Sequence, residues 1–305
     1  PHTKLFHSFC RQVLDEFELD GQVQAAAVEH LALAGSARRS VQLQLSDGSE
    51  IEAGRLVVAT GTGTSIRPTW VNRIQDPFPS YALQHSQDVN LGLCGGVQGL
   101  HILIVGGGLT SAHLAVGAIR RGARVSLLCR RGLRSKPFDA DPGWLGPKYL
   151  KAFQHERCWQ KRKQEVLKAR DGGSITPELT QALRKEMAQG RLQLHEHCEV
   201  ESARWESQDW SLVCSTGQAL RANRIWLATG HHLAVSHHPL LSQLQKQRPI
   251  QLVDDWPVLE DSLQWPGTPV HVMGGLAALQ VGPAARNLFG GREAAQRICR
   301  GLIKA

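Results

Sequence analysis

Residues 101–111 read HILIVGGGLTS, and this stretch decides the fold of the chain. The apolar run at 102–105 predicts a buried strand, and the glycines that follow it open an apolar helix. Gly106 would allow the sharp turn, and Gly108 would admit a pyrophosphate to the free N–H groups at the helix start. A strand at 124–129 follows at the spacing of a βαβ unit. The pattern predicts a dinucleotide-binding unit; the alternative is a strand-to-helix turn that binds nothing.

The residues after the second strand indicate which dinucleotide binds. Arg130 and Arg131 follow it, then Arg134 and Lys136, while residues 101–138 contain neither Asp nor Glu. An acidic residue here usually holds the ribose hydroxyls of NADH, whereas Arg accommodates the 2′-phosphate of NADPH. The basic set therefore favours NADPH. The alternative is a solvated basic surface, because runs of charge usually face water.

One pattern occurs twice, on either side of this unit. Residues 46–61 read SDGSEIEAGRLVVATG and residues 215–230 read STGQALRANRIWLATG, with nine positions identical or exchanged between Ile and Leu. Each copy predicts a turn, a short strand and an apolar strand that is buried on both faces of a parallel sheet. Two copies at this spacing predict two similar domains. Gly106 precedes the second copy by 109 residues, so the equivalent turn of the first domain is expected upstream of residue 1.

Composition excludes several classes of protein. The 305 residues carry a net charge of +8, and no apolar run is long enough to span a bilayer. The sequence has no zinc-finger spacing, RNA-binding signature or basic helix interleaved with aromatics, so we expect neither a nucleic-acid partner nor a membrane. Histidines are adjacent at His231-His232 and His237-His238 and alternate at His195-Glu196-His197, but no carboxylate or cysteine constellation completes a metal site at any of them. We therefore expect no metal.

The cysteines predict a reduced, cytoplasmic protein. None of the seven forms a C-x-x-C pair, which argues against a vicinal redox disulfide and against zinc or iron–sulfur sites. They are Cys10, Cys94, Cys129, Cys158, Cys198, Cys214 and Cys299.

Taken in order, the motifs resemble a known family. An ATG strand, His85-Ser86, the turn IVGGGLTSAHLA, a basic strand end, a second ATG strand and the C-terminal segment GPAARNLFGGREAAQRI follow one another. This order resembles the flavoproteins with two dinucleotide-binding domains, especially flavin-dependent monooxygenases and lysine and ornithine N-hydroxylases. The resemblance implies an FAD- and NADPH-dependent oxidoreductase with a small-molecule substrate. The alternatives are a flavin reductase or dehydrogenase without oxygen insertion, and a non-catalytic nucleotide-binding module.

The expected fold is α/β, with two Rossmann-like, three-layer ββα domains. An FAD-binding domain is expected at 1–92, without its opening βαβ unit, and resumes at 246–305; the NADPH-binding domain at 93–245 is inserted in it. No catalytic side chain is predicted, because the cofactors carry the chemistry. The residues expected at the cofactors are Gly106, Gly108, Thr110, Ser111, Arg130, Arg131, Ala59, Thr60, Gly61, Thr229, Gly230, Gly274, Gly275, Gly282 and Pro283.

Residues 137–190 are expected to form a helical insertion in the NADPH-binding domain. One long polar helix is expected from Pro147 to Gly172-Gly173, and Thr176-Pro177 should begin another. The insertion is either a substrate-binding lid or an element of the core. Trp144, Trp159 and Arg162 are its candidate functional residues.

Overall fold

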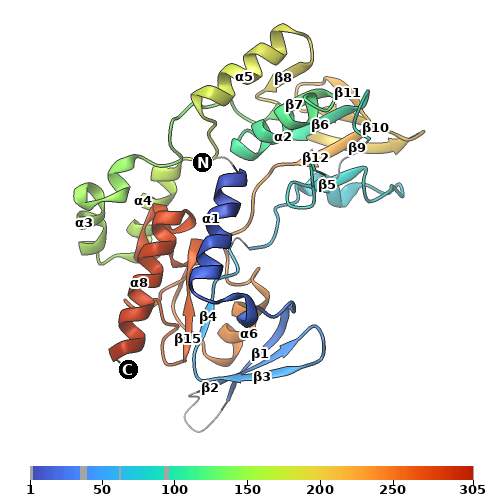
Figure 1. Cartoon of the computed structure of the whole chain (residues 1–305). Coiled ribbons are helices and arrows are strands. Elements are labelled where there is room, and N and C mark those ends of the chain that lie inside the picture. The colour runs from blue at the N-terminus through green and yellow to red at the C-terminus, as the bar shows by residue number, and fades with distance from the viewer. Residues whose placement is uncertain (1–2, 35–39, 62, 93–95, 305) are drawn as a thin grey trace.

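The computed structural model describes residues 3–34, 40–61, 63–92 and 96–304. Its elements form an upper and a lower part (Figure 1). Separate clusters of buried apolar side chains fill the two parts. The expected boundary between residues 92 and 93 falls next to residues outside the described ones, and the expected division into domains stays a prediction.

The upper part is built on a five-stranded parallel sheet in the order β5-β12-β6-β7-β8. These strands are β5 (Leu83–His85), β12 (Arg224–Leu227), β6 (His101–Val105), β7 (Arg124–Cys129) and β8 (Leu192–Glu196). Helices α2 (Leu109–Ile119) and α5 (Pro177–Ala188) pack on one face. An antiparallel sheet of β9 (Val200–Glu206), β10 (Asp209–Cys214) and β11 (Ala219–Ala222) packs on the other. The predicted α/β class and ββα layering are confirmed for this part.

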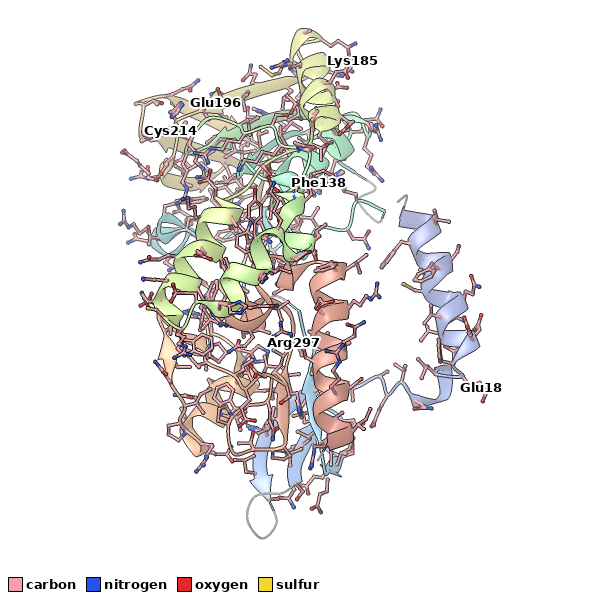
Figure 2. All side chains as sticks on the ribbon, turned by 90° about the vertical axis from the view of Figure 1, so that its left-hand side faces the viewer. Glu18, Phe138, Lys185, Glu196, Cys214 and Arg297 are labelled. Atoms are coloured by element: carbon pink, nitrogen blue, oxygen red, sulfur yellow. The ribbon has the colours of Figure 1, made fainter. Side chains whose placement is uncertain are left out.

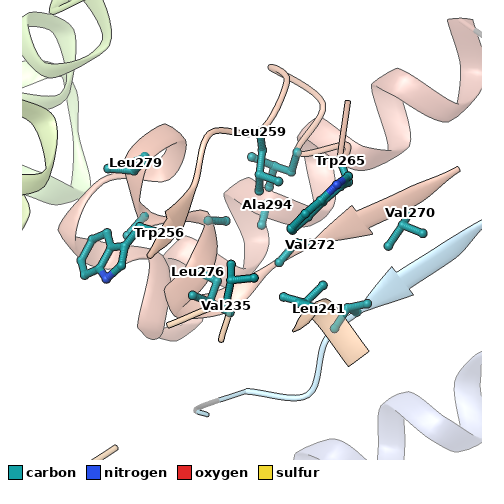
Figure 3. Close-up of a cluster of buried hydrophobic side chains, with 14 of the residues drawn as sticks. Val235, Leu241, Trp256, Leu259, Trp265, Val270, Val272, Leu276, Leu279 and Ala294 are labelled. Carbon is teal, nitrogen blue, oxygen red and sulfur yellow. The ribbon is translucent and has the colours of Figure 1, made fainter. Parts of the chain in front are cut away.

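The lower part gathers segments from across the chain around one core (Figure 3). It contains an antiparallel sheet of β1 (Val28–Ala34), β2 (Ser40–Leu45) and β3 (Glu50–Ala53), and a parallel pair of β4 (Leu56–Val58) and β15 (Val270–Val272). Helix α6 (Pro239–Gln247) lies on β1, where the Gln243 and Gln247 side chains accept hydrogen bonds from the N–H groups of Leu31 and Leu33. Helix α8 (Leu288–Lys304) closes the core.

The remaining elements are short or peripheral. They are α1 (Thr3–Glu16), β13 (Leu252–Val253), β14 (Trp256–Pro257), α7 (Ala278–Val281) and 3-10 turns at Asp20–Gln22, Thr69–Arg73, Pro142–Leu145, Gly274–Ala277 and Pro283–Arg286. Helix α1 stands to one side of the body in Figure 2, and its Leu5, Phe6 and Phe9 are exposed.

The sequence repeat corresponds to a structural repeat. In each copy a meander strand, β3 or β11, leads into a parallel strand, β4 or β12. The hydroxyls of Ser46 and Ser215 accept equivalent hydrogen bonds, from the N–H of Ala27 at 3.0 Å and of Glu199 at 3.1 Å. Gly48 and Gly217 have nearly equal φ values of 82° and 78°. Both copies therefore build the same local fold.

One expectation from the repeat is wrong. Strand β12 is buried on both faces, as predicted, but Val57 of β4 is 39% exposed. Strand β12 has a strand on each side, whereas β4 pairs with β15 on one side only, and the side chain of Val57 stays partly open to solvent although its neighbour His271 on β15 is buried. An apolar run alone cannot distinguish these two environments.

The insertion also differs from the expectation. The predicted long helix is two helices, α3 (Pro147–His155) and α4 (Trp159–Arg170). The chain turns at Glu156, which has an extended ψ of 121°, and the Glu156 carboxylate accepts a hydrogen bond from the N–H of Cys158, just before α4. Phe153 and Val166 belong to the core of the lower part, so α3 and α4 pack there. Helix α5 begins at Pro177 with Thr176 as its N-cap, as predicted.

The chain passes between the two parts four times. It crosses between β4 and the turn at Thr69–Arg73, between β7 and α3, between α4 and α5, and between β12 and α6. The first and last crossings are hydrogen-bonded to each other: Ile66 N donates to Gly230 O, and His232 N donates to Thr64 O, both at 2.9 Å. These bonds hold the ends of the two ATG strands together.

Candidate functional site

The turn between β6 and α2 has the geometry that a close ligand requires. Gly106 has a φ of 143°, and a side chain there would collide with the carbonyl of Ala228. Gly108 is extended and forms the N-cap of α2. Ser111 is buried, and its hydroxyl donates to Gly108 O at 2.6 Å, whereas Thr110 is exposed. Gly106 thus permits the turn, Gly108 presents bare backbone, and Ser111 supports the turn from within.

The start of α2 is suited to an anion. Among the described residues, no side chain caps the helix at Gly108, and its first turn contains no acidic residue. The first N–H groups of a helix lack partners within it and lie at the positive end of the helix dipole. A phosphate group is the ligand that such an end binds most readily.

Acidic side chains approach the basic strand end from elsewhere in the chain. Asp171, the residue after α4, forms an ion pair with Arg134 and lies 3.8 Å from Lys136. Glu196, at the end of β8, accepts a hydrogen bond from the N–H of Leu133 at 2.7 Å. Local sequence gave no sign of either contact. Arg130, which is exposed, and Arg131, which is half-buried, form no ion pair among the described residues.

Residues after α4 also lie against the glycine-rich turn. A Cβ on Gly108 would point toward Gly173, 3.6 Å from its Cα, and a Cβ on Gly173 would lie 2.9 Å from the Cα of Gly108. The two backbones therefore meet where side chains are absent from both. The sequence showed Gly172-Gly173 as a helix end and gave no sign of this contact.

A second group of predicted residues meets at the carboxyl end of β4. Gly61 has a φ of 80°, and a Cβ on Gly274 would lie 3.8 Å from Gly61 O. The hydroxyl of Thr60 lies 2.8 Å from Nε2 of His238. Nδ1 of His238 accepts a hydrogen bond from the N–H of Leu241, so in the neutral ring Nε2 carries the proton and donates to Thr60. Burial lowers the pKa of His238, which favours that neutral ring.

The end of the second ATG strand is hydrogen-bonded to the segment that follows the first ATG strand. Thr229 donates its hydroxyl proton to Ile66 O at 2.5 Å. Buried His85 has Nε2 3.1 Å from Gly230 O, and its ring meets that of His231 edge-on at 5.0 Å. Burial, and then the charge of nearby His231, lower the pKa of His85. This histidine pair is a feature that the sequence patterns did not identify.

The remaining residues that were predicted to bind a cofactor differ in their burial and in their neighbours. Ala59 is exposed beside Thr60, and Gly275 is buried against Leu233. Gly282 has a φ of 94° and packs against α3, while Pro283 O accepts a hydrogen bond from Arg170 at 3.1 Å. The insertion thus contacts the segment that was predicted to approach a cofactor.

Among the described residues, no group of three or more His, Cys, Asp or Glu side chains could hold a metal ion. The six cysteines of that part of the chain are free thiols; Cys94 lies outside it. Nor is any described helix both long and apolar enough to cross a bilayer.

A family model described as pyridine nucleotide-disulphide oxidoreductase matches residues 20–237, more than half of the chain. The chain belongs to this family. Membership confirms the predicted class, an oxidoreductase fold that binds FAD and NAD(P). A comparison of this pyridine nucleotide-disulphide oxidoreductase with curated proteins gives no match.

Several solved structures share the fold of this pyridine nucleotide-disulphide oxidoreductase. L-lysine 6-monooxygenase from Pseudomonas syringae is 16% identical, with a TM-score of 0.73 over 95% of this chain and 73% of that one. Ornithine N-hydroxylase from Kutzneria sp. 744, with reduced FAD, NADP⁺ and L-ornithine, is 14% identical, with a TM-score of 0.73 over 99% and 78%. Bacillithiol disulfide reductase from Bacillus cereus is 17% identical, with a TM-score of 0.56 over 97% and 78%.

Proposed function

We propose that this chain is an NADPH- and FAD-dependent oxidoreductase of the N-hydroxylating monooxygenase type, acting on a small molecule. The observation that carries the proposal is the turn from β6 to α2, with Gly108 as a bare N-cap and Arg130 and Arg131 at the end of the neighbouring strand. NADPH uses these two features together: a helix start for its pyrophosphate and a cation for its 2′-phosphate.

The residues of the two groups fit different cofactors. We assign Gly106, Gly108, Thr110 and Arg130 to NADPH, with Ser111 holding the turn through Gly108 O. We assign Thr60, Gly61 and Gly274 to FAD, because these two glycines have positive φ values and bring bare backbone together at the end of β4. When both cofactors are bound, the nicotinamide supplies a hydride and the flavin accepts it. The protein positions the two groups and keeps water away.

The nucleotide preference tests the first assignment. Binding of NADP⁺ and NAD⁺ to the chain is measured by calorimetry in the presence of FAD, because the oxidised nucleotides bind without reducing the flavin. We expect NADP⁺ to bind about ten- to a hundredfold more tightly, because one charge-assisted phosphate contact contributes roughly 1.5–3 kcal/mol. Arg130→Gln should reduce this preference, because it removes one of the cations proposed for the 2′-phosphate. Arg120→Gln, an exposed change at the other end of α2, is the matched control and should keep it. Equal affinity of the unaltered chain for both nucleotides would contradict the assignment.

A flavin reductase without oxygen insertion is the second candidate. Its support is the shared fold with bacillithiol disulfide reductase, whose name denotes a reductase rather than a monooxygenase. The two candidates differ in what becomes of the electrons from NADPH. Ornithine and lysine, the substrates that two of the solved structures are named for, serve as probes. Hydroxylamine product that matches NADPH consumption supports the monooxygenase, whereas hydrogen peroxide in the same amount, with every probe, supports the reductase.

A further inference from the structure

A carboxylate already occupies the basic strand end. Asp171 follows α4 in a left-handed conformation with a φ of 44°. Its carboxylate is paired with Arg134 and lies 3.8 Å from Lys136 Nζ, and its carbonyl accepts a hydrogen bond from Arg134 at 3.3 Å. Two of the four cations that follow β7 are thus held by an anion from the insertion. A 2′-phosphate would compete for the same side chains.

The next two residues occupy the outer side of the glycine-rich turn. Gly172 has a φ of 73°, and a side chain there would collide with the guanidinium of Arg131. Gly173 packs on Gly108, the residue whose bare backbone is proposed to take the pyrophosphate. Segment 171–173 therefore covers both phosphate positions of the proposed nucleotide site.

The segment is anchored at its far end. Ile175 is fully buried, and it exchanges backbone hydrogen bonds with the chain after β7: Ile175 N donates to Arg134 O, and Lys136 N donates to Ile175 O, both at 2.9 Å. Helix α4 ends just before Asp171. Movement of segment 171–173 would need new backbone angles at Gly172, which has a positive φ and which glycine allows to change at little steric cost.

We propose that segment 171–173 is a built-in competitor of the nucleotide, and that Asp171 sets the discrimination between NADPH and NADH. The carboxylate stands where the 2′-phosphate binds, and the glycine pair stands where the pyrophosphate binds. Nucleotide binding displaces the segment and frees Arg134 and Lys136 for the phosphate. This inference rests on the proposed NADPH site.

The test compares NADP⁺ and NAD⁺ affinities of the full chain and its Asp171→Asn variant by calorimetry. Asn tolerates the left-handed backbone but carries no charge, so the fold is kept. We expect NADP⁺ to bind about threefold to tenfold more tightly, because two partly exposed ion pairs no longer compete, and NAD⁺ to change less. Asp139→Asn, which removes the partner of Arg170 in the same insertion, is the control and should change neither affinity.

A second variant and a second measurement separate the outcomes. Gly173→Ala should also tighten binding, because its Cβ would lie 2.9 Å from the Cα of Gly108 and push the segment away. Hydrogen exchange of residues 171–174 should become faster when NADP⁺ binds. Unchanged or weaker NADP⁺ binding in Asp171→Asn, or slower hydrogen exchange at 171–174, would contradict the proposal that segment 171–173 competes with the nucleotide. Neither result would contradict the proposed NADPH site. If no variant binds either nucleotide, both proposals fail.

Discussion

The two glycines of the turn between β6 and α2 serve different purposes, and single substitutions distinguish them. Gly106→Ala should destabilise the fold by roughly 1–3 kcal/mol, because alanine is strained at a φ of 143° and its Cβ would meet the Ala228 carbonyl. Gly108→Ala should leave stability unchanged, since its Cβ would make an ordinary contact 3.6 Å from Gly173. It should nevertheless weaken NADP⁺ binding at least about tenfold, by filling the pyrophosphate position.

Urea unfolding and calorimetry measure these two effects separately. A Gly106→Ala protein of normal stability would contradict the role of Gly106 in the turn, and normal NADP⁺ affinity in Gly108→Ala would show that the turn is purely structural.

The glycine-rich turn and its surroundings show which features can be predicted from sequence. The glycines that form the turn between β6 and α2 are neighbours in the sequence, so their pattern predicted the turn. Asp171 and Glu196 reach the basic strand end from α4 and β8, and nothing in the neighbouring sequence indicates such long-range contacts.

At the scale of elements, Arg162 fixes the insertion to the rest of the molecule. Its guanidinium donates to the carbonyls of Gln154, Glu156 and Leu279 at 2.8, 2.7 and 3.0 Å, and it stacks on Trp159 at 4.5 Å. Arg162→Ala should therefore lower the free energy of unfolding by about 2–4 kcal/mol, because it leaves three carbonyls without this donor. These contacts support a structural role for the insertion helices rather than a lid.

Arg157→Ala is the matched control, since Arg157 is exposed one residue after the break between α3 and α4. It should change the unfolding free energy by less than about 0.5 kcal/mol. Similar effects of the two changes, in the same chemical denaturation experiment, would contradict the anchoring role of Arg162.

The elements that sequence predicted well are those fixed by local signals. Strands β6 and β7 follow from their apolar runs, and α5 follows from its Thr176 cap. The prediction of a single long helix was wrong. The helix is interrupted at Glu156, where the Glu156 carboxylate accepts a hydrogen bond from the N–H of Cys158 and the Glu156 carbonyl accepts one from Arg162. The prediction that β4 is buried on both faces was wrong, because the neighbours that cover a strand come from distant parts of the chain and do not show in the strand's own sequence.

For the whole molecule, buried histidines predict a loss of stability in mild acid. Burial lowers the pKa of His85, His238 and His271 below the ordinary value of 6.5. The unfolded chain then binds more protons than the folded one, so stability falls as pH drops below about 6.5 toward the folded-state pKa values. Protonation of His238 at Nδ1 would also remove the acceptor for Leu241 N at the start of α6.

Thermal unfolding at pH 7.5 and pH 5.5 tests this expectation. The melting temperature should be lower at pH 5.5, and the difference should shrink in His85→Gln, whose amide can still donate to Gly230 O but does not titrate. Ordinary carboxylates titrate near pH 4 and contribute little in this window. A melting temperature that is equal or higher at pH 5.5 would refute the account.

The four passages of the chain between the upper and lower parts restrict how the molecule can move. A protein whose halves share one tether can swivel freely, but four tethers, two of them hydrogen-bonded to each other, oppose any twist of one half over the other. Rocking about the line of the tethers is the motion that remains. Such a motion would not change which surfaces of the two halves face each other, so groups held on opposite halves would keep the same partners throughout it.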